Sequence, residues 1–221
     1  MKRRPAADVA AEINQPDFIH RIQLLLHDQL HADSLSNLSS GSSILDLPEF
    51  NGRTKITIYN SAVATYFAPS DISGIGGMRR EHIRAAPTWR KGPARYDCIF
   101  VNTNSNEDGM RGLDVARVRL FFSFRYYGIT YPCALIHWFS RVGDAPDEGT
   151  GMWVVEPDFN DDRSPVISII HLETIVRAAH LIGIYGEGFL PRGITMNNSL
   201  DSFNAFYVNK YVDHHAFEIA S

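Results

Sequence analysis

The stretch VARVRLFFSFRYYGITYPCALIHWF, residues 115–139, decides the fold. In its first half the residue type alternates with a period of two: Ala116, Val118, Leu120, Phe122, Phe124 and Tyr126 alternate with Arg117, Arg119, Phe121, Ser123 and Arg125. Because successive side chains of a strand point to opposite faces of a sheet, this period predicts a β-strand. Tyr127-Gly128 interrupts the run and a second apolar stretch follows. We therefore expect a long hairpin with one buried face and one face lined by Arg117, Arg119 and Arg125.

The overall composition is that of a soluble globular protein. The chain has 221 residues, 44% hydrophobic and 21% charged, which suits one domain or two small ones. A net charge of −4 argues against general attraction to nucleic acid but leaves room for a local basic patch. Cys98 and Cys133 lie in apolar runs, so we expect buried free thiols. No run of 18 apolar residues and no signal-peptide core occur, so we expect an intracellular protein without membrane contact.

The N-terminal part differs in composition from the rest. Residues 1–15 have the composition of a loosely ordered terminus, and residues 17–31 carry apolar side chains at helical spacing. Residues 34–43, SLSNLSSGSS, are typical of a linker. We therefore divide the chain into an N-terminal helix with a serine-rich linker, residues 1–43, and a mainly β domain, residues 44–221.

Further strands are predicted along the second part. Residues 54–67 and 96–102 are rich in β-branched and aromatic side chains. Residues 152–157 and 166–170 are separated by turn-forming residues and predict a second hairpin. Residues 171–186 fit either a helix or a strand that resumes after a short turn, and we favour the strand.

The C-terminal segment predicts a helix. Ser199 is a suitable N-cap, and Phe203, Tyr207 and Tyr211 recur every four residues, so we expect a helix of about twenty residues that packs aromatic side chains on the sheet. The fold class we expect is α+β and mainly β. It comprises a bent, barrel-like antiparallel sheet with an N-terminal amphipathic helix and a C-terminal helix packed on it.

The segment 69–95 is the strongest candidate for a binding site. It begins with Gly74-Ile75-Gly76-Gly77, whose spacing matches no phosphate-binding loop and predicts a flexible turn. It then combines basic side chains with one tryptophan: Arg79, Arg80, Arg84, Trp89, Arg90, Lys91 and Arg95. Cations for phosphates beside a ring for stacking are typical of a nucleic-acid surface, with Arg117, Arg119 and Arg125 as a secondary basic face. The alternative is a solvated loop whose arginines pair with the chain's own carboxylates.

Other polar clusters carry weaker signals. The histidines and acids His171, His180, Asp213, His214 and His215 lack the spacing of a zinc motif, and the last three suit the end of a helix. Acids such as Asp144, Asp147 and Glu148 lie in turns, where solvation explains them. We therefore assign no catalytic residue, no metal ligand and no cofactor.

Several strings together resemble a known family. They are APSDISGIGGMRREHIRA (68–85), RYDCIFV (95–101), GMRGLDVARVRLFFSF (109–124), YPCALIHWFSRVGDAPDEGTGMWVVEP (131–157), IIHLETIVRAAHLIGIYG (169–186) and FYVNKYVDHHAFEIA (206–220). They resemble the C-terminal region of Plavaka-type, CACTA-like transposon proteins of mushroom-forming fungi, over most of residues 45–221. This resemblance implies a tail module without the family's DNA-cleavage core, a nuclear location, and DNA, a transposon-encoded protein or a host protein as partner.

Three functional hypotheses follow. The first is a non-catalytic accessory module of a transposon protein that binds DNA or a partner protein through the basic segment and the arginine face. The second is a metal-dependent nuclease or hydrolase in which Asp144, Asp147, His180 and His214 converge. The third is a degenerate remnant with structural value only.

Overall fold

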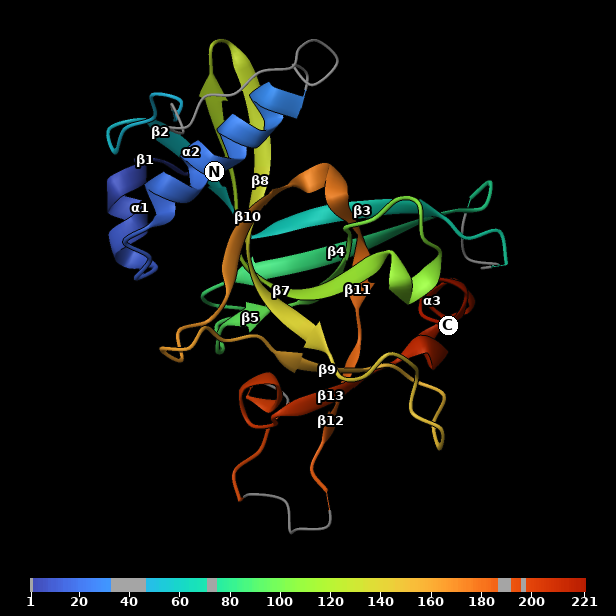
Figure 1. Ribbon diagram of the computed structural model, residues 1–221. Coiled ribbons are helices and arrows are strands. Elements are labelled where there is room, and N and C mark those ends of the chain that lie inside the picture. The colour runs from blue at the N-terminus through green and yellow to red at the C-terminus, as the bar shows by residue number, and fades with distance from the viewer. Residues whose placement is uncertain (1, 33–46, 71–74, 187–191, 196–197) are drawn as a thin grey trace. The chain divides into compact units, whose positions relative to one another are not determined.

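The computed structural model describes residues 2–32, 47–70, 75–186, 192–195 and 198–221 (Figure 1). Contacts divide the chain into two compact units, which we describe separately: unit 1 contains Met1–Tyr59 and Phe122–Cys133, and unit 2 contains Asn60–Phe121 and Ala134–Ser221. The boundary expected near residue 43 falls in residues 33–46, outside the described part of the chain. None of the described helices combines the length and the apolar character needed to cross a membrane.

Unit 1 joins two helices to a small antiparallel ladder. Strand β1 (Lys2–Pro5) pairs with β2 (Lys55–Tyr59), and β2 lies beside β7 (Leu113–Tyr126). Helix α1 (Ala6–Glu12) follows β1 directly, so the expectation of a loosely ordered residue 1–15 segment is wrong. Local composition could not reveal this order, because it depends on β1 pairing with residues fifty positions away.

The predicted amphipathic helix is confirmed as α2 (Phe18–Ala32). Its side chains Phe18, Ile22 and Leu26 are fully buried, as the helical spacing of the apolar residues requires. The Phe18 ring lies 5.1 Å from the ring of Phe122, and Phe50 meets Phe124 edge-on at the same distance. Aromatic side chains of β7 therefore form the core of unit 1 against α2.

The predicted long hairpin is confirmed by β7 and β8 (Ile129–Arg141). Tyr127 and Gly128 have φ values of 43° and 83°, which is the left-handed geometry of a tight hairpin turn. The expected open arginine face is only partly present, because Arg117 and Phe121 are buried whereas Arg119 and Arg125 are exposed. The Arg117 guanidinium is paired with Asp201, which comes from a distant segment, and a strand pattern by itself does not report such a partner.

Unit 2 is mainly β, and its antiparallel sheet is curled into a half-barrel. From β7 the order of neighbours is β8, β9 (Val154–Pro157), β13 (Ala205–Val208) and β12 (Leu181–Ile184). On the other side of β7, β6 (Cys98–Asn102) pairs with β11 (Ile175–Ala179). A separate three-stranded sheet contains β3 (Ser61–Phe67), β4 (Met78–Ala86) and β5 (Arg95–Tyr96).

The prediction of a strand within residues 171–186 is confirmed. A short 3-10 turn, η2 (Leu172–Thr174), precedes β11 and β12.

The predicted hairpin between residues 152–157 and 166–170 is wrong. Strands β9 and β10 (Ile167–His171) both pair with β8 rather than with each other. Because β8 has 13 residues, its edge accommodates two short strands in succession.

The predicted C-terminal helix exists as α3 but is much shorter than expected. It spans His214–Ile219, and Asp213 caps it by accepting a hydrogen bond from the Ala216 backbone at 2.8 Å. Residues before it form η3 (Ser199–Asp201), β13 and η4 (Lys210–Val212), so Ser199 starts only a 3-10 turn. The spacing of aromatic residues misled the prediction, because Phe206 is buried as a strand residue of β13 against Val155.

Candidate nucleic-acid interface

The side chains of β4 alternate between two faces of its sheet, so the basic residues of this strand are divided between an inner and an outer face. Tyr66 and Glu81 lie on the inner face, where the Arg177 guanidinium stands 4.7 Å from the Tyr66 ring and the Ala178 backbone N–H donates to Glu81 Oε2 at 3.1 Å. Arg79 is directly opposite Tyr66 and shares this inner face. By alternation, Arg80, His82 and Arg84 lie on the outer face of β4.

Three guanidinium groups converge on Trp89. Arg84 stands 4.4 Å above the centre of the indole ring, and Arg90 and Arg95 lie at 5.5 and 5.7 Å. Each distance is within the range of a cation–π interaction, which Trp supports best among the aromatic residues. We use the name Trp89 cluster for the ring and these three arginines together with two exposed cations of the same strand and turn: Arg80, Arg84, Trp89, Arg90, Lys91 and Arg95.

The segment 69–95 is not the open basic loop that was expected, because most of its basic residues lie on β4 or in the tight turn to β5. Trp89 and Gly92 form an isolated bridge, and Arg90 and Lys91 between them have φ values of 49° and 63°. This left-handed conformation costs about 1 kcal/mol for a residue other than glycine. The turn therefore holds Arg90 and Lys91 at its tip in a left-handed backbone conformation that is unfavourable for both residues. Gly76 and Gly77, also with positive φ, belong to the predicted turn before β4, and Gly74 lies outside the described residues.

One carboxylate belongs to the cluster. Asp97 pairs with Arg95 at 2.7 Å, and its other oxygen accepts the Arg84 backbone N–H at 2.9 Å. Within the described part of the chain, Arg80, Arg90 and Lys91 pair with no carboxylate. The cluster thus presents an excess of positive charge in a chain whose net charge is −4.

The structure does not bring the secondary basic residues together as one face. Arg117 is buried and forms an ion pair with Asp201, with Nη2 and Oδ2 3.2 Å apart. Arg119 is exposed and lies 5.2 Å from the Tyr96 ring of β5. Arg125 belongs to unit 1 and donates to the Gly128 carbonyl at 3.3 Å. Arg117 and Arg119 thus both lie beside Tyr96 of β5, at 6.0 and 5.2 Å, and of these two Arg119 is the exposed one.

A buried ionic network, which sequence reasoning missed, lies under the inner face of β4. Arg177 is 1% exposed and pairs with both Asp213 and Glu81. Burial by itself would raise the pKa of Glu81, but the His180 hydrogen bond and the Arg177 charge hold it below its usual value. Burial followed by the neighbouring Arg177 charge lowers the pKa of His215, whose ring stacks on Tyr66 at 4.5 Å. Each of these groups has a structural partner.

Of the histidines and acids considered as metal ligands, His180, Asp213 and His215 belong to the Arg177 network and the other histidines lie in separate local pairs. His180 faces Glu81, His214 faces Glu218, and Asp147 accepts hydrogen bonds from Thr150. Among the residues that the structure describes, no three His, Cys, Asp or Glu side chains are grouped as metal ligands. Cys98 and Cys133 are buried free thiols, and burial raises the pKa of each to about 12.

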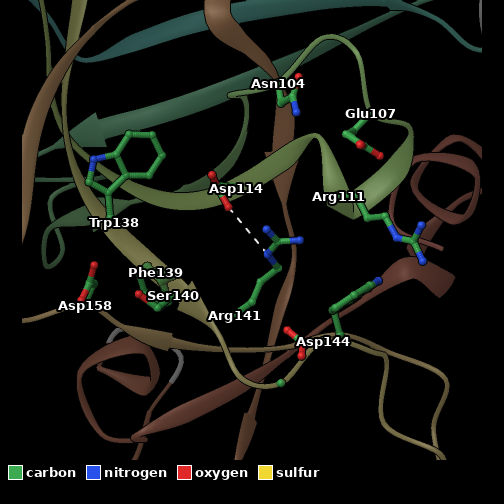
Figure 2. A pocket seen from close by; sticks show the side chains of 12 residues that line it. Asn104, Glu107, Arg111, Asp114, Trp138, Phe139, Ser140, Arg141, Asp144 and Asp158 are labelled. Carbon is green, nitrogen blue, oxygen red and sulfur yellow. Dashed lines mark ion pairs between the residues drawn. The ribbon is translucent and has the colours of Figure 1, made fainter.

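Unit 2 also contains a polar cleft that the sequence did not indicate (Figure 2). Its volume is about 760 Å³, and it lies among the β6–β7 loop, the C-terminal half of β8 and the segments that flank β9. The Arg141–Asp114 pair, with Nε and Oδ1 3.8 Å apart, stands in its middle. Its remaining walls combine aromatic, acidic and uncharged polar side chains with a second guanidinium, that of Arg111.

Comparison of the chain with family models, with curated proteins and with solved structures gave no match.

Proposed function

We propose that this chain is a non-catalytic accessory module that binds the phosphate backbone of nucleic acid through the Trp89 cluster. The observation that carries the proposal is the convergence of Arg84, Arg90 and Arg95 on one indole ring. Guanidinium groups held in this way lose little conformational freedom when they meet phosphates. The unpaired Arg80 and Lys91 add charge beside them.

The ring of Trp89 has a different role in this proposal from the one expected from sequence. Arg84 covers the ring at 4.4 Å, so the indole organises cations rather than offering that face to a base. Contacts to phosphates without base stacking carry little sequence information. We therefore propose binding with weak sequence preference and a strong dependence on salt.

The resemblance to Plavaka-type transposon proteins agrees with this proposal. A tail module that adds phosphate contacts would raise the affinity of a longer DNA-processing protein without contributing to bond cleavage. Under this proposal the protein works in the nucleus, with DNA as its partner.

The test is a matched pair of triple variants. Arg80→Ala/Arg90→Ala/Lys91→Ala removes exposed cations of the Trp89 cluster, and Arg53→Ala/Lys55→Ala/Arg192→Ala removes the same charge from exposed positions elsewhere. Binding of a labelled duplex is measured between 50 and 200 mM salt. Because each lost phosphate contact changes the slope of log K against log salt by about 0.9, the first triple should reduce the slope by about 3. Equal losses in both variants, or no binding by the wild-type protein at low salt, contradict the proposal.

A further inference from the structure

Trp138 and Asp158 form a cross-strand pair in the cleft of Figure 2. The Asp158 backbone N–H donates to the Trp138 carbonyl at 2.9 Å, next to the registered pair Phe139–Pro157. Residues directly opposite in an antiparallel ladder share a face, with Cβ atoms about 5 Å apart. The two side chains therefore leave the sheet on the same face, and Figure 2 shows both at one end of the cleft.

The surrounding hydrogen bonds hold this pair in place. Trp138 Nε1 donates to Ser168 Oγ at 2.9 Å, so the polar edge of the indole is bound within the protein. The Trp138 backbone N–H donates to the Val166 carbonyl at 3.0 Å, and the Asp158 carbonyl accepts from Val166 at 2.9 Å and bonds to the His137 ring at 2.8 Å. Both Trp138 and Asp158 remain partly exposed. Part of the ring thus stays accessible on the face of the sheet that also carries the Asp158 carboxylate.

The charge of the cleft favours a cation. Its walls contain four carboxylates, Glu107, Asp114, Asp144 and Asp158, and two guanidinium groups, Arg111 and Arg141. Arg141 is already engaged, because it donates to the Met110 carbonyl at 2.8 Å and pairs with Asp114. Among the described side chains, Asp158, Asp144 and Glu107 have no cationic partner.

We propose that this cleft binds a basic peptide segment, with a lysine or arginine side chain placed between the π-face of Trp138 and the carboxylate of Asp158. An aromatic face next to an unpaired carboxylate attracts an organic cation through both the ring quadrupole and the full charge. A phosphate or nucleotide ligand would meet the excess negative charge of the walls.

The layout of the cleft favours a peptide over a small monovalent cation. Figure 2 shows Trp138 and Asp158 on one side of the Arg141–Asp114 pair and Glu107 and Asp144 on the other. Arg111 lies on the same side as Glu107 and Asp144, so the end at Asp158 is the purely acidic one and the other end combines two carboxylates with one guanidinium. An extended segment with one cationic side chain at Asp158 and a second near Glu107 or Asp144 suits this layout. This inference does not depend on the proposed nucleic-acid function, since it uses other residues.

The three tryptophans of the chain provide a direct measurement. The indole N–H signals of Trp89, Trp138 and Trp153 are followed by NMR while a capped five-residue peptide with two lysines is added, and Trp138→Phe identifies the Trp138 signal. The same peptide with acetylated lysines is the neutral control, and tetramethylammonium is the small-cation control. We expect the lysine peptide to shift the Trp138 signal while the acetylated peptide leaves it unchanged. Equal shifts with both peptides, or tighter binding of tetramethylammonium, overturn the proposal.

A matched pair of variants tests the carboxylate. Asp158→Asn should weaken lysine-peptide binding about fivefold, which is the loss of affinity expected when a partly exposed charge contact beside an aromatic ring is removed. Asp161→Asn removes the same charge from an exposed position outside the cleft and should leave binding within twofold of the wild type. An equal loss in the two variants overturns the assignment of Asp158. The comparison of peptides on the wild-type protein decides the proposal even where a variant is unstable.

Discussion

Arg177 and Asp213 are joined by two parallel hydrogen bonds, Nη1 to Oδ1 and Nη2 to Oδ2, each 2.7 Å long. Arg177 belongs to β11 and is 1% exposed, and Asp213 is the residue that caps α3. A buried guanidinium requires such a partner, because an unpaired charge inside a protein is costly. This pair therefore anchors the C-terminal helix to the sheet of unit 2.

Asp213→Asn should destabilise the protein by about 2 kcal/mol, since it leaves Arg177 buried beside a neutral group. Asparagine is also a good N-cap, so the substitution removes the charge while preserving the cap of α3. Glu218→Gln is the matched control in the same helix, because both members of the His214–Glu218 pair are exposed, 60% and 52%, and this pair should contribute less than about 1 kcal/mol. The measurement is urea unfolding at pH 7, and equal effects of the two substitutions would contradict this account.

The stabilisation by Asp213 should disappear in acid. The hydrogen bonds from Arg177 lower the pKa of Asp213 from 3.8 to about 2. A carboxyl group with a depressed pKa contributes its full stability above its unfolded pKa, and this contribution is lost as the pH falls through the folded value. The difference in unfolding free energy between wild type and Asp213→Asn should thus shrink between pH 5 and pH 2. A difference that stays constant over this range argues against the pair as its source.

His215 should make the protein less stable below about pH 6.5. Burial and the adjacent Arg177 charge lower its pKa, with Asp213, Glu81 and Glu218 acting in the opposite direction. The neutral ring is therefore favoured in the folded protein, and stability falls as the pH drops below the unfolded value toward the folded one. His215→Phe keeps a ring against Tyr66 and should reduce the loss of stability between pH 7.5 and 5.5.

His137 also has a pKa lowered by burial, so part of the pH dependence should remain in His215→Phe. Thermal or urea unfolding at several pH values measures both contributions. If the variant loses stability in acid as steeply as the wild type, His215 is not responsible.

Trp89→Leu should weaken nucleic-acid binding without changing its dependence on salt. The substitution releases Arg84, Arg90 and Arg95 from the ring but keeps every charge of the Trp89 cluster. We expect about a threefold to tenfold loss of affinity, from cation–π contacts of about 1 kcal/mol. Trp89→Phe, which retains a ring, should lose less. A loss that depends on the bases of a single-stranded probe would instead indicate base stacking by the indole.

Gly112→Ala should destabilise unit 2 by about 2–3 kcal/mol, because the backbone leaves no room for a side chain. A Cβ atom at this position would lie 2.3 Å from the Glu107 carbonyl oxygen and 2.5 Å from that of Asn104. Gly149→Ala is the control, since its nearest neighbour would be 3.6 Å away and it lies in an exposed loop. Chemical unfolding of both variants measures the difference, and equal stabilities would contradict the crowding at Gly112.

The sequence predicted the parts of the fold that depend on local periodicity. The period of two in residues 115–126 and the turn at Tyr127-Gly128 specified the β7–β8 hairpin, and helical spacing specified α2. The prediction of a long C-terminal helix failed because Phe203, Tyr207 and Tyr211 recur at helical spacing although Ala205–Val208 forms a strand. A short apolar segment takes its conformation from the strand beside it, which here is β9.

For the candidate site, composition identified the basic residues but not their arrangement. Alternation along β4 places Arg79 and Arg80 on opposite faces, which could not be predicted while this segment was taken for a loop. The acidic cleft was missed for a related reason, because Glu107, Asp144 and Asp158 come from separate loops and share no motif. Positions along the sequence do not show which side chains from separate loops lie close together in the folded protein.

The sequence by itself determined the mainly β class, the hairpin, the first long helix and the concentration of positive charge between residues 79 and 95. The tertiary structure alone decided which charges are available. It buries Arg117 against Asp201, 84 positions away, and Arg177 against Asp213, 36 positions away, and it gathers Arg84, Arg90 and Arg95 on Trp89. The physical reason is that periodicity reports which side of its own strand a residue occupies. The partner that neutralises or exposes a charge comes from another element, and only packing brings it there.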